Sequence, residues 1–169
     1  MKKIFLLLTV GIISLTSCNN DDDFVNTTPV GDGDTIGETI DLTGVNLTFD
    51  PNTGRYAIVY PFEPAIFDSD VVLVYRRTLD DGFNVWQPIP RTLYFDNGDE
   101  LDYDFNFSAN DVLIYATGNF DLGFAPGFTQ NQQFRIVIVP SDFATDLSGV
   151  SYDEVARKLN IKESAVIKK

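Results

Sequence analysis

The sequence predicts an all-β protein, an immunoglobulin-like antiparallel β-sandwich with a short C-terminal helix. Short apolar or alternating runs recur along the chain, separated by Gly, Pro, Asn and Asp, as in strands joined by turns. Aromatic residues form 13% of the chain, which favours strands because their rings fit a pleated, half-buried surface. The expected segments are a lipoprotein signal peptide (1–17), an acidic flexible tether (18–37), the β-sandwich domain (38–150) and a C-terminal helix and tail (151–169).

The first segment has the three parts of a bacterial signal peptide in order. Lys2 and Lys3 precede the apolar run 4–15, which is shorter than the roughly 20 residues that span a bilayer. Small residues then precede Cys18, the only cysteine, and this arrangement resembles the bacterial lipobox. The resemblance implies that Cys18 is acylated, for example with palmitate, and becomes the first mature residue. An ordinary secretory signal with a chance cysteine is the alternative.

The tether is rich in Asn, Asp, Thr, Gly and Pro, which is typical of a flexible linker. The acidic cluster Asp21–Asp23, close behind Cys18, resembles the surface-export signal of Bacteroidota lipoproteins; a solvated spacer is the alternative. The resemblance implies a lipid-anchored location on the outer membrane, exposed at the cell surface. Asp34-Thr35-Ile36 resembles an O-glycosylation acceptor of the same bacteria, which makes Thr35 a candidate modification site.

The sandwich segment contains runs of three kinds. Val71–Tyr75 and Phe134–Val139 are continuously apolar, which predicts central strands. Leu101–Phe107 alternates apolar and polar residues, which predicts one face in the core and one in water. The expected strands are Thr39–Leu42 with Val45–Phe49, Tyr56–Phe62, Val71–Arg76, Phe83–Gln87, Thr92–Phe95, Leu101–Phe107, Val112–Thr117 and Phe134–Val139.

Asn97-Gly98 is a hairpin signal between two of these strands. A two-residue loop would set Phe95 opposite Glu100. A longer loop, from Asp96 to Glu100, would set Phe95 opposite Leu101 and Leu93 opposite Tyr103. Directly opposed residues share a face, so burial of apolar side chains favours the longer loop.

The C-terminal segment changes to a helical period. Ser151 and Glu154 have the spacing of a capping box, and Val150 and Val155 that of a hydrophobic staple. We therefore expect a helix over about Tyr152–Leu159 that packs against the sandwich, followed by a frayed or weakly helical tail.

Charge and composition exclude several functions. The chain has 25 Asp and Glu against 12 Lys and Arg, and loss of residues 1–17 makes the net charge more negative than −13. Such a polyanion repels nucleic acid, so no nucleic-acid partner is expected. Without histidine, zinc sites and Ser–His or Cys–His nucleophile systems are excluded, and no cofactor is expected.

Four aromatic residues, Trp86, Phe120, Phe124 and Phe128, are candidate ligand-binding residues. The three phenylalanines lie in a stretch with Gly and Pro, which predicts a loop, and loops carry function more often than strands do. An exposed apolar patch there would mark an interaction site. The alternative is a loop that packs its rings into one end of the sandwich.

The acidic loops Asp32–Asp34 and Asp96–Asp102 could hold calcium, a cation that takes six to eight oxygen ligands. Neither loop follows the EF-hand order, and turn chemistry explains their Asp, Asn and Gly residues. We therefore expect no metal site.

The order of four segments resembles a group of small flavobacterial lipoproteins, a family that implies no particular activity or catalytic residue. The resemblance covers roughly Thr39 to Leu159. The segments that carry it are Val71–Tyr75, Val85–Pro90, Asp111–Tyr115 and Phe134–Pro140.

The sequence therefore favours a lipid-anchored lipoprotein of the cell envelope or surface, whose sandwich is a non-enzymatic binding or interaction module. Its partners would be the membrane, through the lipid, and a glycan or a protein. A glycan-binding domain of a surface uptake system is the second hypothesis. A hydrolase is the third, and it requires two carboxyl groups that converge in a pocket with a perturbed pKa.

Overall fold

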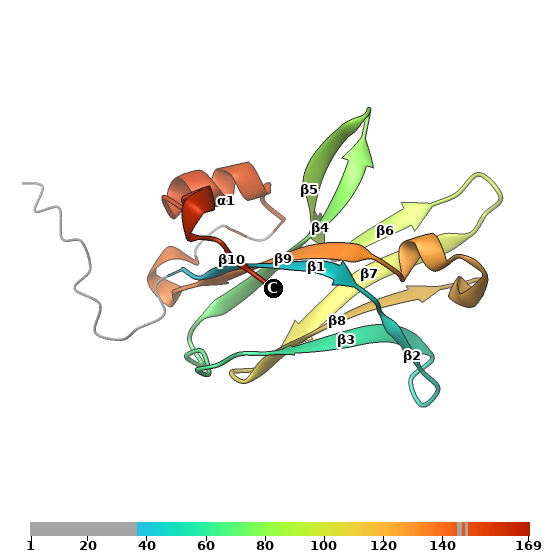
Figure 1. The fold of residues 1–169 in the computed structure, drawn as a ribbon, viewed down its shortest axis with the longest axis horizontal. Helices are drawn as coiled ribbons and strands as arrows, with labels where there is room; N and C mark the ends of the chain where they lie inside the picture. Colours follow the sequence, from blue (N-terminus) through green and yellow to red (C-terminus); the bar gives the residue numbers. More distant parts are fainter. Residues whose placement is uncertain (1–36, 145–146, 148) are drawn as a thin grey trace, which may run out of the picture. The chain divides into compact units, whose positions relative to one another are not determined.

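The computed structural model of the chain describes residues 37–144, 147 and 149–169. Within them two five-stranded sheets pack face to face, and one helix lies outside the first sheet (Figure 1). The predicted all-β sandwich with a short C-terminal helix is confirmed. With five strands in each sheet, it is larger than an immunoglobulin constant domain, whose sheets hold four and three strands.

The first sheet orders its strands as β10 (Ile167–Lys168), β1 (Thr39–Val45), β9 (Gln132–Val139), β4 (Val71–Asp80) and β5 (Phe83–Ile89). The second sheet orders them as β2 (Thr48–Asp50), β3 (Arg55–Pro61), β8 (Asp111–Gly118), β7 (Glu100–Phe107) and β6 (Arg91–Tyr94). All pairings are antiparallel except that of β1 with β10. The helix is α1 (Tyr152–Lys158), and short 3-10 turns are η1 (Leu122–Phe124), η2 (Pro126–Phe128), η3 (Ser141–Phe143) and η4 (Glu163–Ala165).

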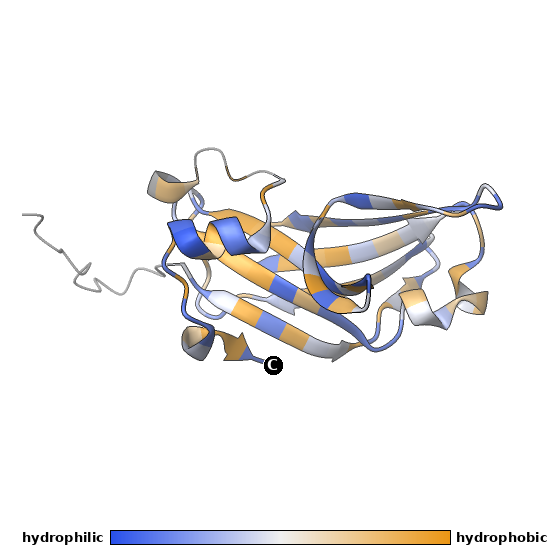
Figure 2. Ribbon diagram, turned by 90° about the horizontal axis from the view of Figure 1, so that it is seen from above, coloured by the Kyte–Doolittle hydropathy of each residue, from blue (hydrophilic) through white to orange (hydrophobic). Residues whose placement is uncertain are grey.

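The core lies between the sheets, where alternate residues of each strand point inward. Leu101 and Tyr103 of β7 are buried there, as the alternation predicts, whereas Phe107 at the strand end is 44% exposed. β9 and β4 are interior strands, as predicted. Their continuous apolar runs have a physical reason: sheet two covers one face and α1 covers the other. Figure 2 shows these apolar bands beneath the more hydrophilic α1.

The predicted register of the β6–β7 hairpin is wrong. Leu93 lies opposite Leu101 and Tyr94 opposite Glu100, so neither proposed loop forms. The loop has three residues, 96–98, closed by hydrogen bonds from the Gly98 amide to the Phe95 carbonyl (2.9 Å) and from the Phe95 amide to the Asp99 carbonyl (3.0 Å). Gly98 has φ +88°, the left-handed conformation that this turn needs and that glycine supplies without strain.

The β4–β5 hairpin extends beyond the rest of the first sheet (Figure 1). Its last pair is Asp80 with Phe83, so Asp81-Gly82 is a two-residue turn, and both turn residues have positive φ. Pairing of β4 with β9 ends at Arg76, which leaves the edge of β4 from residue 77 to 80 uncovered by β9.

The predicted helix is confirmed over Tyr152–Lys158, but the capping box is not. The Ser151 hydroxyl donates to the Glu154 carboxylate (3.0 Å), and the side chain makes no hydrogen bond to a backbone amide of the helix. The prediction of a frayed tail is also wrong. β10 pairs with β1, Val166 is buried, and Glu163 binds a buried arginine, so the tail forms part of the fold.

The two ends of the sandwich can be told apart by the two ends of strand β9. The Ile138 amide donates to the Glu38 carbonyl (2.8 Å), so the described chain enters beside the C-terminal end of β9. The loop that contains η1 and η2 leads into the other end of β9 at Gln132, roughly 20 Å away at about 3.3 Å per residue (Figure 1). We call the Glu38 side the entry end and the opposite side the distal end.

The predicted signal peptide, the tether up to residue 36, the lipidated Cys18 and the candidate glycosylation site Thr35 lie outside the described residues. Among the described helices, none has the length and apolar character required to cross a membrane.

Candidate functional site

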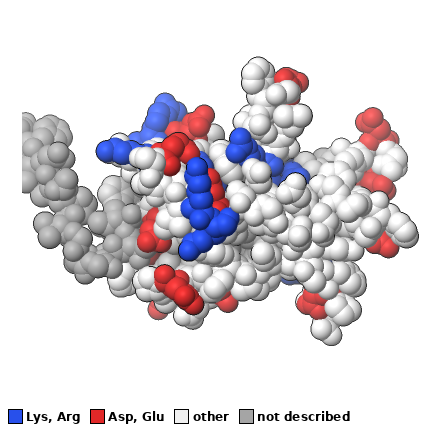
Figure 3. All heavy atoms as spheres, viewed as in Figure 1, with Lys and Arg blue, Asp and Glu red and all other residues white. Residues whose placement is uncertain are grey.

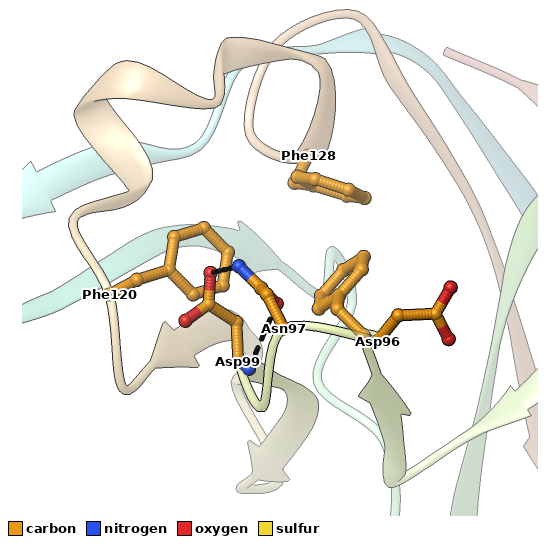
Figure 4. A pocket seen from close by; sticks show the side chains of 6 residues that line it. Asp96, Asn97, Asp99, Phe120 and Phe128 are labelled. Atoms are coloured by element: carbon orange, nitrogen blue, oxygen red, sulfur yellow. Dashed lines mark hydrogen bonds between the residues drawn. The ribbon is translucent and has the colours of Figure 1, made fainter.

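A hollow lined mainly by aromatic rings lies at the distal end. We call it the aromatic hollow; it has a volume of about 370 Å³. The β6–β7 hairpin forms one wall and the loop that leads to β9 forms the other (Figure 4). Its lining residues are Phe95, Asp96, Asn97, Asp99, Phe120 and Phe128.

Three rings meet edge to face in this hollow. Phe95 packs against Phe120 (centroids 5.9 Å apart, planes at 90°) and against Phe128 (5.5 Å, 66°). Edge-to-face packing fixes the rings relative to one another, and all three remain half-buried. The hollow therefore offers rigid apolar surface to a ligand.

Polar groups of the hairpin loop stand beside the rings. The Asn97 side-chain amide donates to the Asp99 carboxylate (2.7 Å), and the Asp99 backbone amide donates to the Asn97 side-chain oxygen (3.1 Å). These two bonds hold the loop as a fixed polar rim, while Asp96 extends away from the rings (Figure 4). An apolar floor with a few oriented polar groups is typical of small-ligand sites.

The loop from residue 119 to 131 is held by local hydrogen bonds. Asp121 caps η1, because its carboxylate accepts from the Gly123 amide (2.8 Å). The Tyr103 hydroxyl, on β7, donates to the Phe128 carbonyl (2.7 Å) and joins the loop to the second sheet. The position of Phe128 is thus set by the core.

The structure brings only two of the four predicted aromatic residues together in this hollow. Phe120 and Phe128 line it, and Phe124 lies between them in the chain with its ring 89% exposed. Trp86 is elsewhere, half-buried on the outer face of the first sheet beside α1. Phe95 was missed, because only the hairpin fold brings its strand beside residues 120–128.

Trp86 belongs to a cluster around Arg135, which we call the Arg135 cluster; its other members are Asp41, Tyr152 and Glu163. Arg135 is 3% exposed and forms two hydrogen bonds with Asp41 (2.6 and 2.7 Å) and two with Glu163 (2.7 and 3.1 Å). The Trp86 and Tyr152 rings lie 4.5 and 4.4 Å from its guanidinium carbon. All its nitrogens are used, so the cluster has a structural role.

The pKa shifts of Arg135, Glu163 and Tyr152 agree with a structural role for the cluster. Burial lowers the pKa of Arg135, but hydrogen bonds to Asp41 and Glu163 outweigh it and the net shift is upward. The hydrogen bond from Arg135 holds the pKa of Glu163 below its usual range. Burial, with the bond to Glu163, raises the pKa of Tyr152 to about 12. Arg135 and Glu163 therefore stay charged over the neutral range, and Tyr152 stays neutral.

A second hollow lies on the outer face of the second sheet and has a volume of about 360 Å³. Two of its carboxylates are already engaged by hydroxyl groups: Asp104 accepts from Tyr115 (2.9 Å) and Asp102 accepts from Thr92. The Arg55 guanidinium covers the Tyr115 ring at 4.3 Å. These side chains already form hydrogen bonds or cation–π contacts with one another. This hollow is therefore a weaker candidate for a ligand-binding site than the aromatic hollow.

Metal ligands do not gather in the described part of the chain: no group of three or more Asp, Glu, Cys or His residues there could hold an ion. Comparison with protein-family profiles, curated proteins and solved structures gave no match.

Proposed function

We propose that this chain is a lipid-anchored lipoprotein of the outer membrane, exposed at the cell surface, whose β-sandwich is a non-enzymatic binding module. The aromatic hollow at the distal end is the observation that carries the binding role. It lies at the opposite end of β9 from Glu38, which is close to the start of the described chain. A tether that joins the domain at the Glu38 end would leave the hollow unobstructed by the attachment point.

We further propose a glycan as the ligand. Sugar rings present apolar C–H faces and a rim of hydroxyl groups. The hollow offers matching surfaces, because Phe120 and Phe128 supply ring faces and Asn97 with Asp99 supplies donors and acceptors. Phe124, exposed on the same loop, could extend the apolar surface to a longer chain.

The pKa shifts of two carboxyl groups support the non-enzymatic assignment, because both shifts are downward. A glycosidase needs a general acid with a raised pKa. The pKa of Asp50 is lowered by its hydrogen bond from the Asn52 amide, and that of Glu163 by Arg135. Neither group lines the aromatic hollow.

Replacement of Phe128 by alanine should weaken glycan binding about tenfold or more, because it removes a central apolar contact. A glycan array with the purified protein would identify a ligand, and calorimetry would measure the change. Tyr94→Ala is the matched control, since its ring is 75% exposed on the same hairpin but outside the hollow. Equal losses in both variants, or an array without any bound glycan, would contradict the glycan proposal.

The anchor has a separate test. In Cys18→Ser the acyl acceptor is lost, so labelling with a palmitate analogue should disappear and an uncleaved precursor should accumulate. Ser17→Ala keeps a small residue before the cysteine and should behave like the wild type. Protease treatment of intact cells should remove the wild-type domain. Unchanged labelling of Cys18→Ser would rule out this anchor.

A further inference from the structure

A third hollow, with a volume of about 290 Å³, contains two arginines and no acidic residue in its described lining. It lies where β4 continues past the start of β9, at the foot of the β4–β5 hairpin. We call it the Arg76 hollow. Apart from Leu79, its lining residues carry a positive charge, an amide or a hydroxyl: Arg76, Arg77, Thr78, Asn84, Asn131, Gln132 and Gln133.

Arg76 is rigidly held without a counter-ion. Its Nε and Nη2 donate to the side-chain oxygen of Gln132 (2.9 and 2.7 Å), and its guanidinium lies 4.3 Å over the Tyr103 ring. Gln132 is fixed in turn, because its amide nitrogen donates to the carbonyls of Gly127 (2.9 Å) and Gln130 (2.7 Å). These contacts leave Nη1 without a partner among the described residues.

This arrangement is unusual in so acidic a chain. The ion pairs found in the described residues both belong to Arg135, so neither Arg76 nor Arg77 has a carboxylate within 4.0 Å there. Burial lowers the pKa of Arg76, opposed by the Tyr103 phenol. On the face seen in Figure 3, basic side chains lie at the foot of the β4–β5 hairpin, whereas around α1 basic and acidic side chains are mixed.

A half-buried guanidinium without a counter-ion is suited to an oxyanion. Its Nη1 group, with the second hydrogen of Nη2, can form a forked contact with a carboxylate or a sulfate. Arg77 points to the other face of β4, where its guanidinium lies over the Trp86 ring, so Arg76 alone would make this contact. Because Gln132 and Tyr103 already hold Arg76 in place, little side-chain freedom is lost when an anion binds.

The Arg76 hollow and the aromatic hollow are joined through one loop. Gln132, which orients Arg76, donates to Gly127, and Tyr103, which lies under Arg76, donates to the carbonyl of Phe128. Phe128 lines the aromatic hollow. One loop therefore lines both hollows, with Phe128 in the aromatic hollow and Asn131 and Gln132 in the Arg76 hollow.

We infer that Arg76 binds the oxyanion of an acidic glycan, either a uronate carboxylate or a sulfate ester. The inference rests on the proposed glycan-binding function and names its ligand class. Arg76 makes the forked contact, and Gln132 is a positioning residue.

The test compares oligogalacturonates with the same oligomers after reduction of their carboxyl groups, by calorimetry on the purified full chain. Arg76→Gln should weaken binding of the charged oligomer about tenfold to a hundredfold, as for loss of a charge-assisted hydrogen bond, and leave binding of the reduced oligomer within about twofold. Arg76→Lys, which keeps the charge but loses the fork, should fall between the two. A sulfated galactan compared with its desulfated form tests the sulfate source.

Lys158→Gln removes one positive charge from the exposed end of α1 and should leave both affinities unchanged. If it weakens binding as much as Arg76→Gln does, only general charge attraction is at work and the inference fails. It also fails if the wild type binds charged and neutral oligomers equally well.

A second measurement separates this inference from the proposed function. The arginine Nε–H resonances can be followed by NMR while sodium glucuronate or sodium sulfate is added. A saturating shift of the Arg76 signal supports the oxyanion site even if no glycan binds the aromatic hollow. No shift, while neutral glycans still bind, overturns the inference and leaves the proposed function intact.

Discussion

Replacing Asp41 by asparagine is expected to lower the free energy of unfolding by about 3–5 kcal/mol, the usual cost of removing one partner from a buried ion pair. Arg135 is 3% exposed and bonds both carboxylate oxygens of Asp41. The amide of asparagine supplies one acceptor and no charge, so the guanidinium would remain buried with part of its charge unpaired. Urea unfolding followed by Trp86 fluorescence reports on this cluster directly.

Glu163→Gln is the matched control for that prediction. Its side chain also makes two bonds to Arg135, but it is 69% exposed, so water can replace it and the loss should be about 1 kcal/mol or less. A double variant, Asp41→Leu with Arg135→Met, removes both buried charges and should be more stable than Asp41→Asn alone. Equal losses for Asp41→Asn and Glu163→Gln would refute this account of the cluster.

Phe134→Ala should be similarly severe, with a loss of about 3–5 kcal/mol. The Phe134 side chain is fully buried between the two sheets on the central strand β9, so its removal leaves a cavity that neighbouring strands cannot close. Since whole domains are stable by only about 5–15 kcal/mol, this variant should be close to unfolding at physiological temperature. Circular dichroism against temperature or urea would measure the change.

Phe124→Ala removes the same number of atoms from a ring that is 89% exposed, and its unfolding free energy should stay within about 0.5 kcal/mol of the wild type. A large loss in Phe124→Ala would mean that its ring is packed, against the structure. A small loss in Phe134→Ala would mean that the sheets do not enclose it.

The sequence was sufficient to predict the strands β1 to β9, because the burial of one or both faces of a strand gives it alternating or continuous apolar residues. β9 and β4 read as central strands since helix and sheet cover both their faces, and β7 alternates since one of its faces meets water. Register was harder. The β6–β7 loop depends on main-chain hydrogen bonds at Gly98, and apolar residues on one face fit more than one pairing.

The C-terminal tail was mispredicted for a different reason. Its order comes from contacts with residues that are distant in the chain: β10 pairs with β1, Val166 is buried, and Glu163 bonds Arg135, 28 positions away. Local polarity made the segment look unstructured. Only the fold brings these partners together.

The candidate site could be predicted only in part. A loop with three phenylalanines was identifiable, and two of them line the aromatic hollow. Phe95 looked like an ordinary strand residue. Arg76 could not be predicted as a binding residue, because nothing in the sequence indicates that an arginine will lack a carboxylate neighbour. Such sites arise from what the fold brings together and what it keeps apart.

The position of β1 has a mechanical consequence. The described chain enters through Glu38 straight into β1, which is bonded along one edge to β9 and along the other to β10. Interstrand hydrogen bonds run across the strands, so a pull along β1 strains many of them at once instead of unzipping them singly. If the domain is held by a lipid at Cys18 while it binds a polymer, a force on the polymer would be transmitted through β1. The hydrogen bonds of β1 to β9 and β10 would then resist that force together.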